Sequence, residues 1–137
     1  MRPLLLDTCA VIWIAAGAEI SELAEKALQD AASESAAIAI SPISIWEIGL
    51  LVARGRLALS TSPRAWIATV LEQPGVTLAG MLPDMLLDSS FLPGEPPRDP
   101  ADRIILATAR AEGMRIVTRD RAMLSYAQAG HAEVIAC

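Results

Sequence analysis

The chain has 137 residues, of which 53% are hydrophobic, and its formal net charge at pH 7 is −5. This length is typical of one domain, spanning residues 1–137, and the hydrophobic content excludes a disordered chain. The acidic balance argues against binding nucleic acid by bulk charge, and an aromatic content of only 4% argues against a stacking platform for single strands.

The cysteine and histidine content excludes further kinds of site. Cys9 and Cys137 are the two cysteines and His131 is the one histidine, so neither a disulfide framework nor a zinc-ligand pattern is present. This usage favours a reducing, cytoplasmic location. The N-terminal segment has the outline of a signal peptide, but Asp7 interrupts its apolar region. No uncharged apolar run of 18 residues occurs, so we predict no membrane span.

Apolar runs alternate with helical patterns along the whole chain. In chain order we predict a strand at 3–7, helices at 8–16 and 22–34, a strand at 37–40, helices at 43–54 and 62–74, a strand at 76–79, helices at 82–91 and 99–112, a strand at 114–118, a helix at 120–128 and a strand at 132–135. This alternation is typical of an α/β fold with a parallel sheet. In such sheets, sites form at the carboxyl ends of the strands.

Two aspartates fall at that edge. Asp7 ends the first predicted strand, and Asp120 lies two residues past the fourth. Two further carboxylates stand on apolar helix faces: Glu47 shares a face with Ile43 and Leu50, and Asp102 shares one with apolar residues three, four and seven positions on. An unpaired charge on such a face is costly.

Each acid also has a purely structural interpretation. Asp7, Asp99 and Asp120 suit helix N-caps, while Glu47 and Asp102 could pair with arginines. As a set, however, several acids with no catalytic histidine and no nucleophile motif indicate one cluster of oxygen ligands. Like charges gathered together need a cation, and hard oxygen ligands select Mg²⁺ or Mn²⁺.

Basic residues concentrate between positions 98 and 121, which hold six of the eleven in the chain. They could be solvated helix faces and caps, or some could line a site for an anionic substrate. The candidates for phosphate contacts are Arg98, Arg103, Arg119 and Arg121.

Four blocks of the sequence, in order, resemble the PIN-domain family and specifically its VapC-type toxin ribonucleases. They are LLLDTCAVIW, SPISIWEIGLLVARGRL, RDPADRIILATA and IVTRD. The first resembles the family's hydrophobic–Asp–Thr/Ser start, and the second its Ser–x–x–Ser–x–Trp–Glu–Ile signature. The third and fourth resemble its Asp–Pro–x–Asp–Arg block and its closing Thr–x–Asp. One departure is the loop before Asp99, which reads GEPPR where relatives often hold a histidine.

The resemblance implies a three-layer αβα fold with a central, mostly parallel sheet, and a Mg²⁺- or Mn²⁺-dependent endoribonuclease. The family's acidic constellation carries over onto Asp7, Glu47, Asp102 and Asp120, with metal ligation by Asp7, Asp102 and Asp120. Thr118 resembles a supporting hydroxyl, and Asp99 assists or only caps. The resemblance also implies a transfer or ribosomal RNA substrate, an inhibiting VapB-type antitoxin and a homodimer. Trp13 and Trp46 could line a cleft for the antitoxin or belong to the core.

Three alternatives compete with this interpretation. An aspartyl-phosphate phosphohydrolase using Asp7 as nucleophile would want an aspartate two residues on, where this chain has Cys9, and a basic partner near the site. A receiver-type signalling domain fails on the same point, because the only lysine of the chain is Lys26. A non-catalytic binding module, with the acids as caps and ion pairs, predicts no metal-linked stabilisation and no effect of Asp7→Asn on RNA.

Overall fold

The computed structural model describes residues 2–137. Its strands are β1 (Leu4–Leu6), β2 (Ile38–Ile40), β3 (Val76–Leu78), β4 (Arg115–Thr118) and β5 (Val134–Ala136). Its helices are α1 (Thr8–Ala15), α2 (Glu22–Ser33), α3 (Pro42–Ala53), α4 (Pro63–Leu71), α5 (Pro83–Ser90), α6 (Pro100–Glu112) and α7 (Arg121–Gln128). Every predicted element is present, with boundaries that differ by a few residues.

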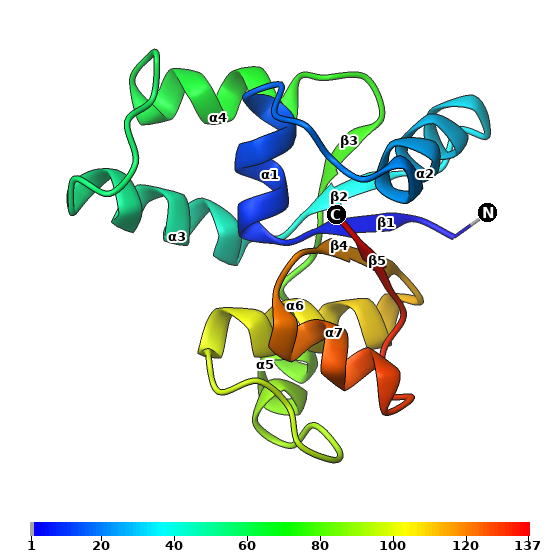
Figure 1. Cartoon of the computed structure of the whole chain (residues 1–137). Coiled ribbons are helices and arrows are strands. Elements are labelled where there is room, and N and C mark those ends of the chain that lie inside the picture. Colours follow the sequence, from blue (N-terminus) through cyan, green and yellow to red (C-terminus); the bar gives the residue numbers. More distant parts are fainter. Residues whose placement is uncertain (1) are drawn as a thin grey trace.

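The strands form one sheet in the order β3-β2-β1-β4-β5, and all four neighbouring pairs are parallel. Figure 1 shows α1 and α2 on one side of this sheet and α5, α6 and α7 on the other. The predicted three-layer αβα architecture is therefore confirmed. The chain order reverses at β1, so β2 and β4 lie on either side of it, and the crevice at this switch point is where ligands bind in such folds.

The strand β1 joins the two halves of the hydrophobic core. Leu4 and Leu6 pack with buried residues of α1 and α2 on one face of the sheet. Leu5, between them, packs on the other face with Ile105 of α6 and Met123 of α7. Alternate residues of a strand point to opposite faces, and a strand covered on both sides has to be apolar throughout. This is why LLL occupies the centre of the sheet.

Local chemistry sets the helix ends at this edge. Asp7, Asp99 and Asp120 each accept a hydrogen bond from a backbone N–H in the first turn of the following helix. A side-chain oxygen at this position satisfies a donor that would otherwise lack a partner. At the far end of α6, Gly113 has φ +66°, which suits a glycine C-cap. Three of the predicted site residues are thus held at helix N-termini.

No helix in residues 2–137 combines the length and apolar character needed to cross a membrane.

Candidate active site

Asp7 is the most buried carboxylate of the predicted set, with 4% of its surface exposed. One of its oxygens accepts from the Ala10 N–H at 2.7 Å. The other accepts from the Thr118 hydroxyl. Burial raises the pKa of Asp7, the two hydrogen bonds oppose that rise, and the charge of Asp120 adds to it. The side chain is thus fixed in orientation while its charge lacks a cationic partner among these contacts.

The turn between β4 and α7 brings a second acid to the same place. The Thr118 hydroxyl, fully buried, donates to Asp7 and accepts from the Asp120 N–H at 2.9 Å. Asp120 caps α7 through the Met123 N–H, and its carboxylate is exposed. A single hydroxyl therefore links the two predicted metal ligands at the ends of adjacent strands.

Helix α3 contributes Glu47 through a contact that the sequence analysis missed. The Thr8 hydroxyl lies within hydrogen-bond distance of Glu47 Oε1 and, at 3.0 Å, of the buried Ser44 hydroxyl. Burial raises the pKa of Glu47, the bond from Thr8 lowers it, and the charges of Asp99 and Asp7 raise it further. Thr8 and Ser44 thus hold Glu47 toward β1. Thr8 and Ser44 both lie within the quoted motifs. The Asp–Thr and Ser–x–x–Ser spacings were therefore the sequence features from which the positioning of Glu47 could have been predicted.

Helix α6 supplies Asp102. The Asp102 N–H donates to Asp99 at 3.0 Å, so Asp99 acts as the N-cap. Burial raises the pKa of Asp102 to about 7, and the charges of Asp99, Asp120, Glu47 and Asp7 add to the rise. The charge of every other acid of the predicted set therefore raises the pKa of Asp102. The five carboxylates thus form one electrostatic cluster.

Cys9 reports on the same cluster. Its pKa is raised to about 11 by burial and by the charges of Asp7, Glu47, Asp102 and Asp120. The thiol of this second residue of α1 therefore lies in a negative electrostatic field. We name Asp7, Glu47, Asp99, Asp102 and Asp120 the acid cluster.

The four predicted phosphate-contacting arginines divide into two pairs. Arg103 donates through Nε to the Pro97 carbonyl at 2.7 Å, and Arg119 donates through Nε to the Cys137 carbonyl at 3.0 Å. Arg98 and Arg121 are exposed at the start of α6 and α7. Because the first pair already uses donors within the fold, only Arg98 and Arg121 enter the RNA-binding surface proposed below.

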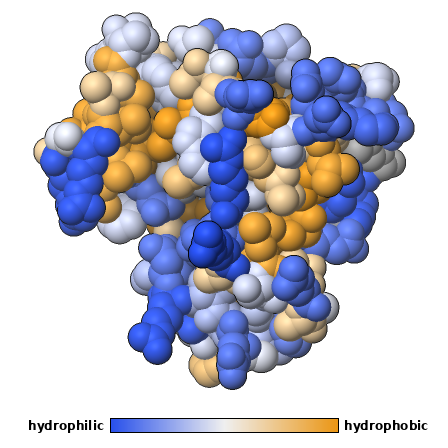
Figure 2. Space-filling model, viewed as in Figure 1, coloured by the Kyte–Doolittle hydropathy of each residue, from blue (hydrophilic) through white to orange (hydrophobic). Residues whose placement is uncertain are grey.

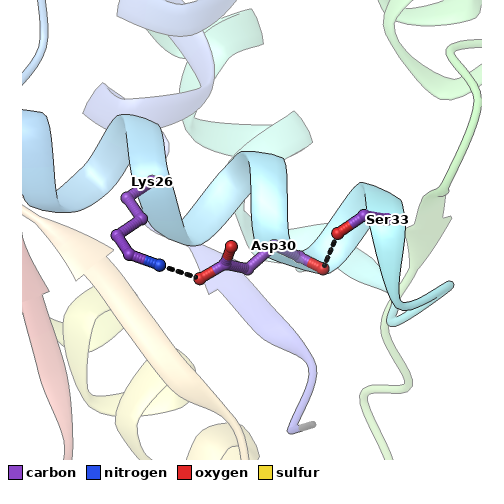
Figure 3. A network of polar contacts seen from close by, with 3 residues as sticks. All are labelled: Lys26, Asp30 and Ser33. Carbon is purple, nitrogen blue, oxygen red and sulfur yellow. Dashed lines mark hydrogen bonds and ion pairs between the residues drawn. The ribbon is translucent and has the colours of Figure 1, made fainter.

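The single lysine of the chain contributes nothing to the acid cluster. Lys26 Nζ lies 2.8 Å from Asp30 Oδ2, one turn along α2, and the Asp30 carbonyl accepts from the Ser33 hydroxyl at 3.2 Å. Figure 3 shows these three residues and the two contacts. The lysine that a receiver domain would need is therefore engaged elsewhere. The salt bridges that we identify within residues 2–137, Arg2–Glu133 and Lys26–Asp30, leave the cluster carboxylates uncompensated.

The donor chemistry of the cluster fits a hard divalent cation. All its donors are carboxylate oxygens, burial and mutual repulsion raise the pKa of Asp7, Glu47 and Asp102, and such ions relieve this repulsion. Within residues 2–137, however, no three histidine, cysteine or acidic side chains are placed so that they could hold a metal as they stand. Mg²⁺ commonly binds through only one or two carboxylates together with water and substrate phosphate, so the cluster suits that mode.

Two clefts adjoin this edge of the sheet. One, of about 270 Å³, runs from Trp46 and Glu47 past Arg54 to Asp99. The other, of about 580 Å³, is lined by apolar residues of α1, β2 and α4, including Trp66. Figure 2 shows apolar side chains gathered where α1, α3 and α4 lie in Figure 1. Trp46 is 59% exposed, so it belongs to this surface rather than to the core.

Comparisons with known proteins agree with this geometry. A family model described as the PIN domain matches residues 4–129. Ribonuclease VapC22 of Mycobacterium tuberculosis is 32% identical over 126 residues, covering 92% of this chain and 93% of that protein. The chain therefore belongs to the PIN-domain family, as its sequence motifs predicted. Within this family, the identity over nearly the full length groups it with the VapC-type ribonucleases of toxin–antitoxin modules.

Solved structures share the fold. VapBC2 from Rickettsia felis, crystallised with a promoter DNA fragment, matches with a TM-score of 0.67 at 14% identity, covering 97% of both chains. FitAcB from Neisseria gonorrhoeae matches with a TM-score of 0.58 at 22% identity, covering 97% of this chain and 96% of that one. PAE2754 from Pyrobaculum aerophilum matches with a TM-score of 0.63 at 20% identity, covering 97% of this chain and 89% of that one.

Proposed function

We propose that this protein is a metal-dependent endoribonuclease, the toxin of a VapBC-type module, with residues 1–137 forming one catalytic domain. The observation that carries the proposal is the acid cluster: five coupled carboxylates at the switch point of a parallel sheet, with Asp102 raised to a pKa of about 7. The family membership and the identity to a VapC ribonuclease support it.

In this proposal the cation is held by Asp7, Asp102 and Asp120, one or two of them directly and the rest through bound water, and Glu47 completes the catalytic set. Mg²⁺, with Mn²⁺ as the alternative, would supply polarisation of the scissile phosphate and a lowered pKa for a bound water. Thr118 keeps Asp7 oriented, in the way that hydrogen-bonded outer groups orient metal ligands. Asp99 caps α6 and assists by adding negative charge.

The chain's own groups define the rest of the reaction. Water attacks the phosphorus in line with the bond to O3′, that bond breaks, and the products carry a 5′-phosphate and a 3′-hydroxyl. The cluster has no histidine or lysine to act as base, so a carboxylate such as Glu47 accepts the proton of the water. Arg98 and Arg121 hold the flanking phosphates of the RNA. The proposed substrate is a structured RNA such as a transfer or ribosomal RNA.

The first test is cleavage of total cellular RNA by protein purified free of antitoxin, in Mg²⁺, Mn²⁺ or EDTA. We expect discrete fragments with 5′-phosphates, produced only with a divalent cation and absent with the Asp7→Asn variant. Fragments ending in 2′,3′-cyclic phosphates would contradict the mechanism. A folded protein that leaves RNA intact in every cation would favour a non-catalytic binding module instead.

The proposed protein partner is a VapB-type antitoxin, because the related VapBC2 structure is a toxin–antitoxin complex. The apolar cleft beside α1 and α4 and the cleft from Trp46 to Asp99 would receive an extended, partly apolar peptide. A basic side chain of that peptide would meet the uncompensated acid cluster. We expect such a peptide to inhibit cleavage, and Trp46→Ala to weaken the inhibition.

A homodimer is the proposed assembly, in a cytoplasmic setting. Exposed apolar side chains on β3, on α5 and in the segments beside them offer a place for a second copy. These large side chains are between 37% and 82% exposed: Leu78, Met81, Leu82, Leu86, Leu87 and Phe91. Exposed apolar patches of this kind mark interaction sites. Leu87→Lys should convert a dimer into a monomer in analytical ultracentrifugation.

A further inference from the structure

Arg119 lies in the turn that joins β4 to α7, between Thr118 and Asp120. Its guanidinium makes three contacts outside that turn. Nε donates to the Cys137 carbonyl at 3.0 Å, and one terminal nitrogen donates to the Glu19 carbonyl at 2.6 Å. The carbon at the centre of the group lies 4.0 Å from the centre of the Trp13 ring, which is within the range of a cation–π contact.

These anchors belong to three different segments of the chain. Trp13 is on α1, Glu19 is in the connection between α1 and α2, and Cys137 follows β5. The Cys137 N–H donates back to the Thr118 carbonyl at 2.8 Å. Two hydrogen bonds therefore join Cys137 to the turn between β4 and α7: the Cys137 N–H donates to Thr118, and the Cys137 carbonyl accepts from Arg119.

The same turn carries two parts of the acid cluster. Thr118 donates to Asp7 and accepts from the Asp120 N–H, and Asp7 is the N-cap of the helix that holds Trp13. Arg119 thus connects the helix that begins at one carboxylate with the turn that holds the next. A planar guanidinium can serve two carbonyls and one ring at once, whereas an ammonium group cannot.

We propose that Arg119 is a positioning residue for the nuclease reaction, one that fixes Asp120 and Thr118 relative to Asp7 without touching the substrate. The proposal rests on the ribonuclease function stated above. It assigns Arg119 a role different from that of Arg98 and Arg121, whose side chains are free to meet phosphate.

The test compares Arg119→Met and Arg119→Lys with the wild type and with a control, Arg64→Met, in which an exposed arginine of α4 is changed in the same way. Cleavage kinetics on one RNA give kcat and KM. RNA binding in EDTA at several salt concentrations gives Kd and its salt dependence, and thermal melting gives the folded fraction. Wild type and Asp7→Asn are assayed alongside.

We expect Arg119→Met to lower kcat by about 10- to 100-fold, the range seen when groups that orient metal ligands are removed, with KM, Kd and the salt slope unchanged. Arg119→Lys should recover part of the loss, because its charge still stacks on Trp13 while it reaches only one carbonyl. If Arg119→Met does not fold, the proposal is tested with Arg119→Lys, in which kcat should fall while KM, Kd and the salt slope stay unchanged.

Three results would overturn the proposal. An unchanged kcat in both variants would show that the contacts do not matter for catalysis. A raised Kd with a flatter salt slope would make Arg119 a phosphate contact. A loss of kcat that disappears well below the melting temperature of the variant would reduce the role to stability. A wild type that cleaves no RNA would instead overturn the ribonuclease function itself, which separates the two failures.

Discussion

The two edges of the sheet differ in how their carboxylates are compensated. At the carboxyl edge, Asp7, Glu47 and Asp102 are buried or half-buried, and burial and mutual repulsion raise the pKa of each. At the amino edge and on the adjacent α2, two acids stand in ion pairs: Glu133 with Arg2, and Asp30 with Lys26.

This difference separates functional from structural charge. Ion pairs at the surface contribute little to stability and require nothing else. Buried carboxylates without such partners reduce the stability of the fold unless a cation or a substrate relieves them. The proposed function accounts for carboxylates kept at the switch point at this cost. The following experiments compare changes in the acid cluster with changes elsewhere in the molecule.

The largest effect should come from Asp102→Asn compared with Asp30→Asn. The two substitutions have the same shape, but Asp102 is coupled to every cluster acid whereas Asp30 pairs with Lys26 on α2. We expect Asp102→Asn to lower the rate of RNA cleavage by more than about 100-fold, beyond the cost of losing an outer-shell group, and Asp30→Asn to leave it unchanged. Equal rates for the two variants would remove Asp102 from the site.

Thr118→Val should cause a smaller loss of cleavage activity, and Thr108→Val serves as its control. Both threonines are fully buried, but Thr108 bonds to the Ile104 carbonyl within α6 whereas Thr118 orients Asp7. We expect about a 10- to 100-fold fall in kcat for Thr118→Val only. If both variants lose activity in proportion to their melting temperatures, the effect is one of stability.

The third prediction concerns stability and pH in the absence of divalent cations. The folded pKa of Asp102 is about 7, against an ordinary value of 3.8. Between these values the folded state binds a proton that the unfolded state has released, so stability falls as pH rises from about 4 to about 7. Asp102→Asn, which stays neutral, should therefore raise the melting temperature in EDTA at pH 8, on the order of a few degrees.

Added Mg²⁺ gives the converse result. A cation that binds only the folded state raises its stability, so we expect Mg²⁺ to raise the melting temperature of the wild type at pH 8 and to have a smaller effect on Asp102→Asn. Calorimetry with and without EDTA measures both. If Mg²⁺ does not change the melting temperature of the wild type, the acids would serve only as helix caps.

The smallest effect belongs to Lys26→Met at the opposite edge. Lys26 is largely exposed and pairs with Asp30 one turn along α2, a type of contact with little measurable value. We expect cleavage to be unchanged and the denaturation midpoint to stay within experimental error. A marked loss of activity would show that the two edges are coupled.

The sequence by itself determined the fold and predicted the acids of the proposed site. Apolar runs such as Leu4–Leu6, which have to be covered on both faces, alternate with capped helices, and this pattern specifies a parallel sheet with helices on either side. The ordered motifs around Asp7, Glu47, Asp102 and Asp120 single out the acids of the proposed site, because carboxylates on apolar helix faces or at strand ends are costly and therefore informative. The Asp99 cap was also predictable, since an aspartate stood directly before a proline.

Only the tertiary structure decided which groups meet. The bonds from Thr8 to Glu47 and from Thr118 to Asp7 join residues 39 and 111 positions apart, and periodicity carries no information on such distant contacts. The arginines show the same limit: Arg119 and Arg121 are both exposed and alike in sequence, yet Arg119 bonds to the distant carbonyls of Glu19 and Cys137. A long side chain takes its role from the neighbours that the folded chain places within its reach.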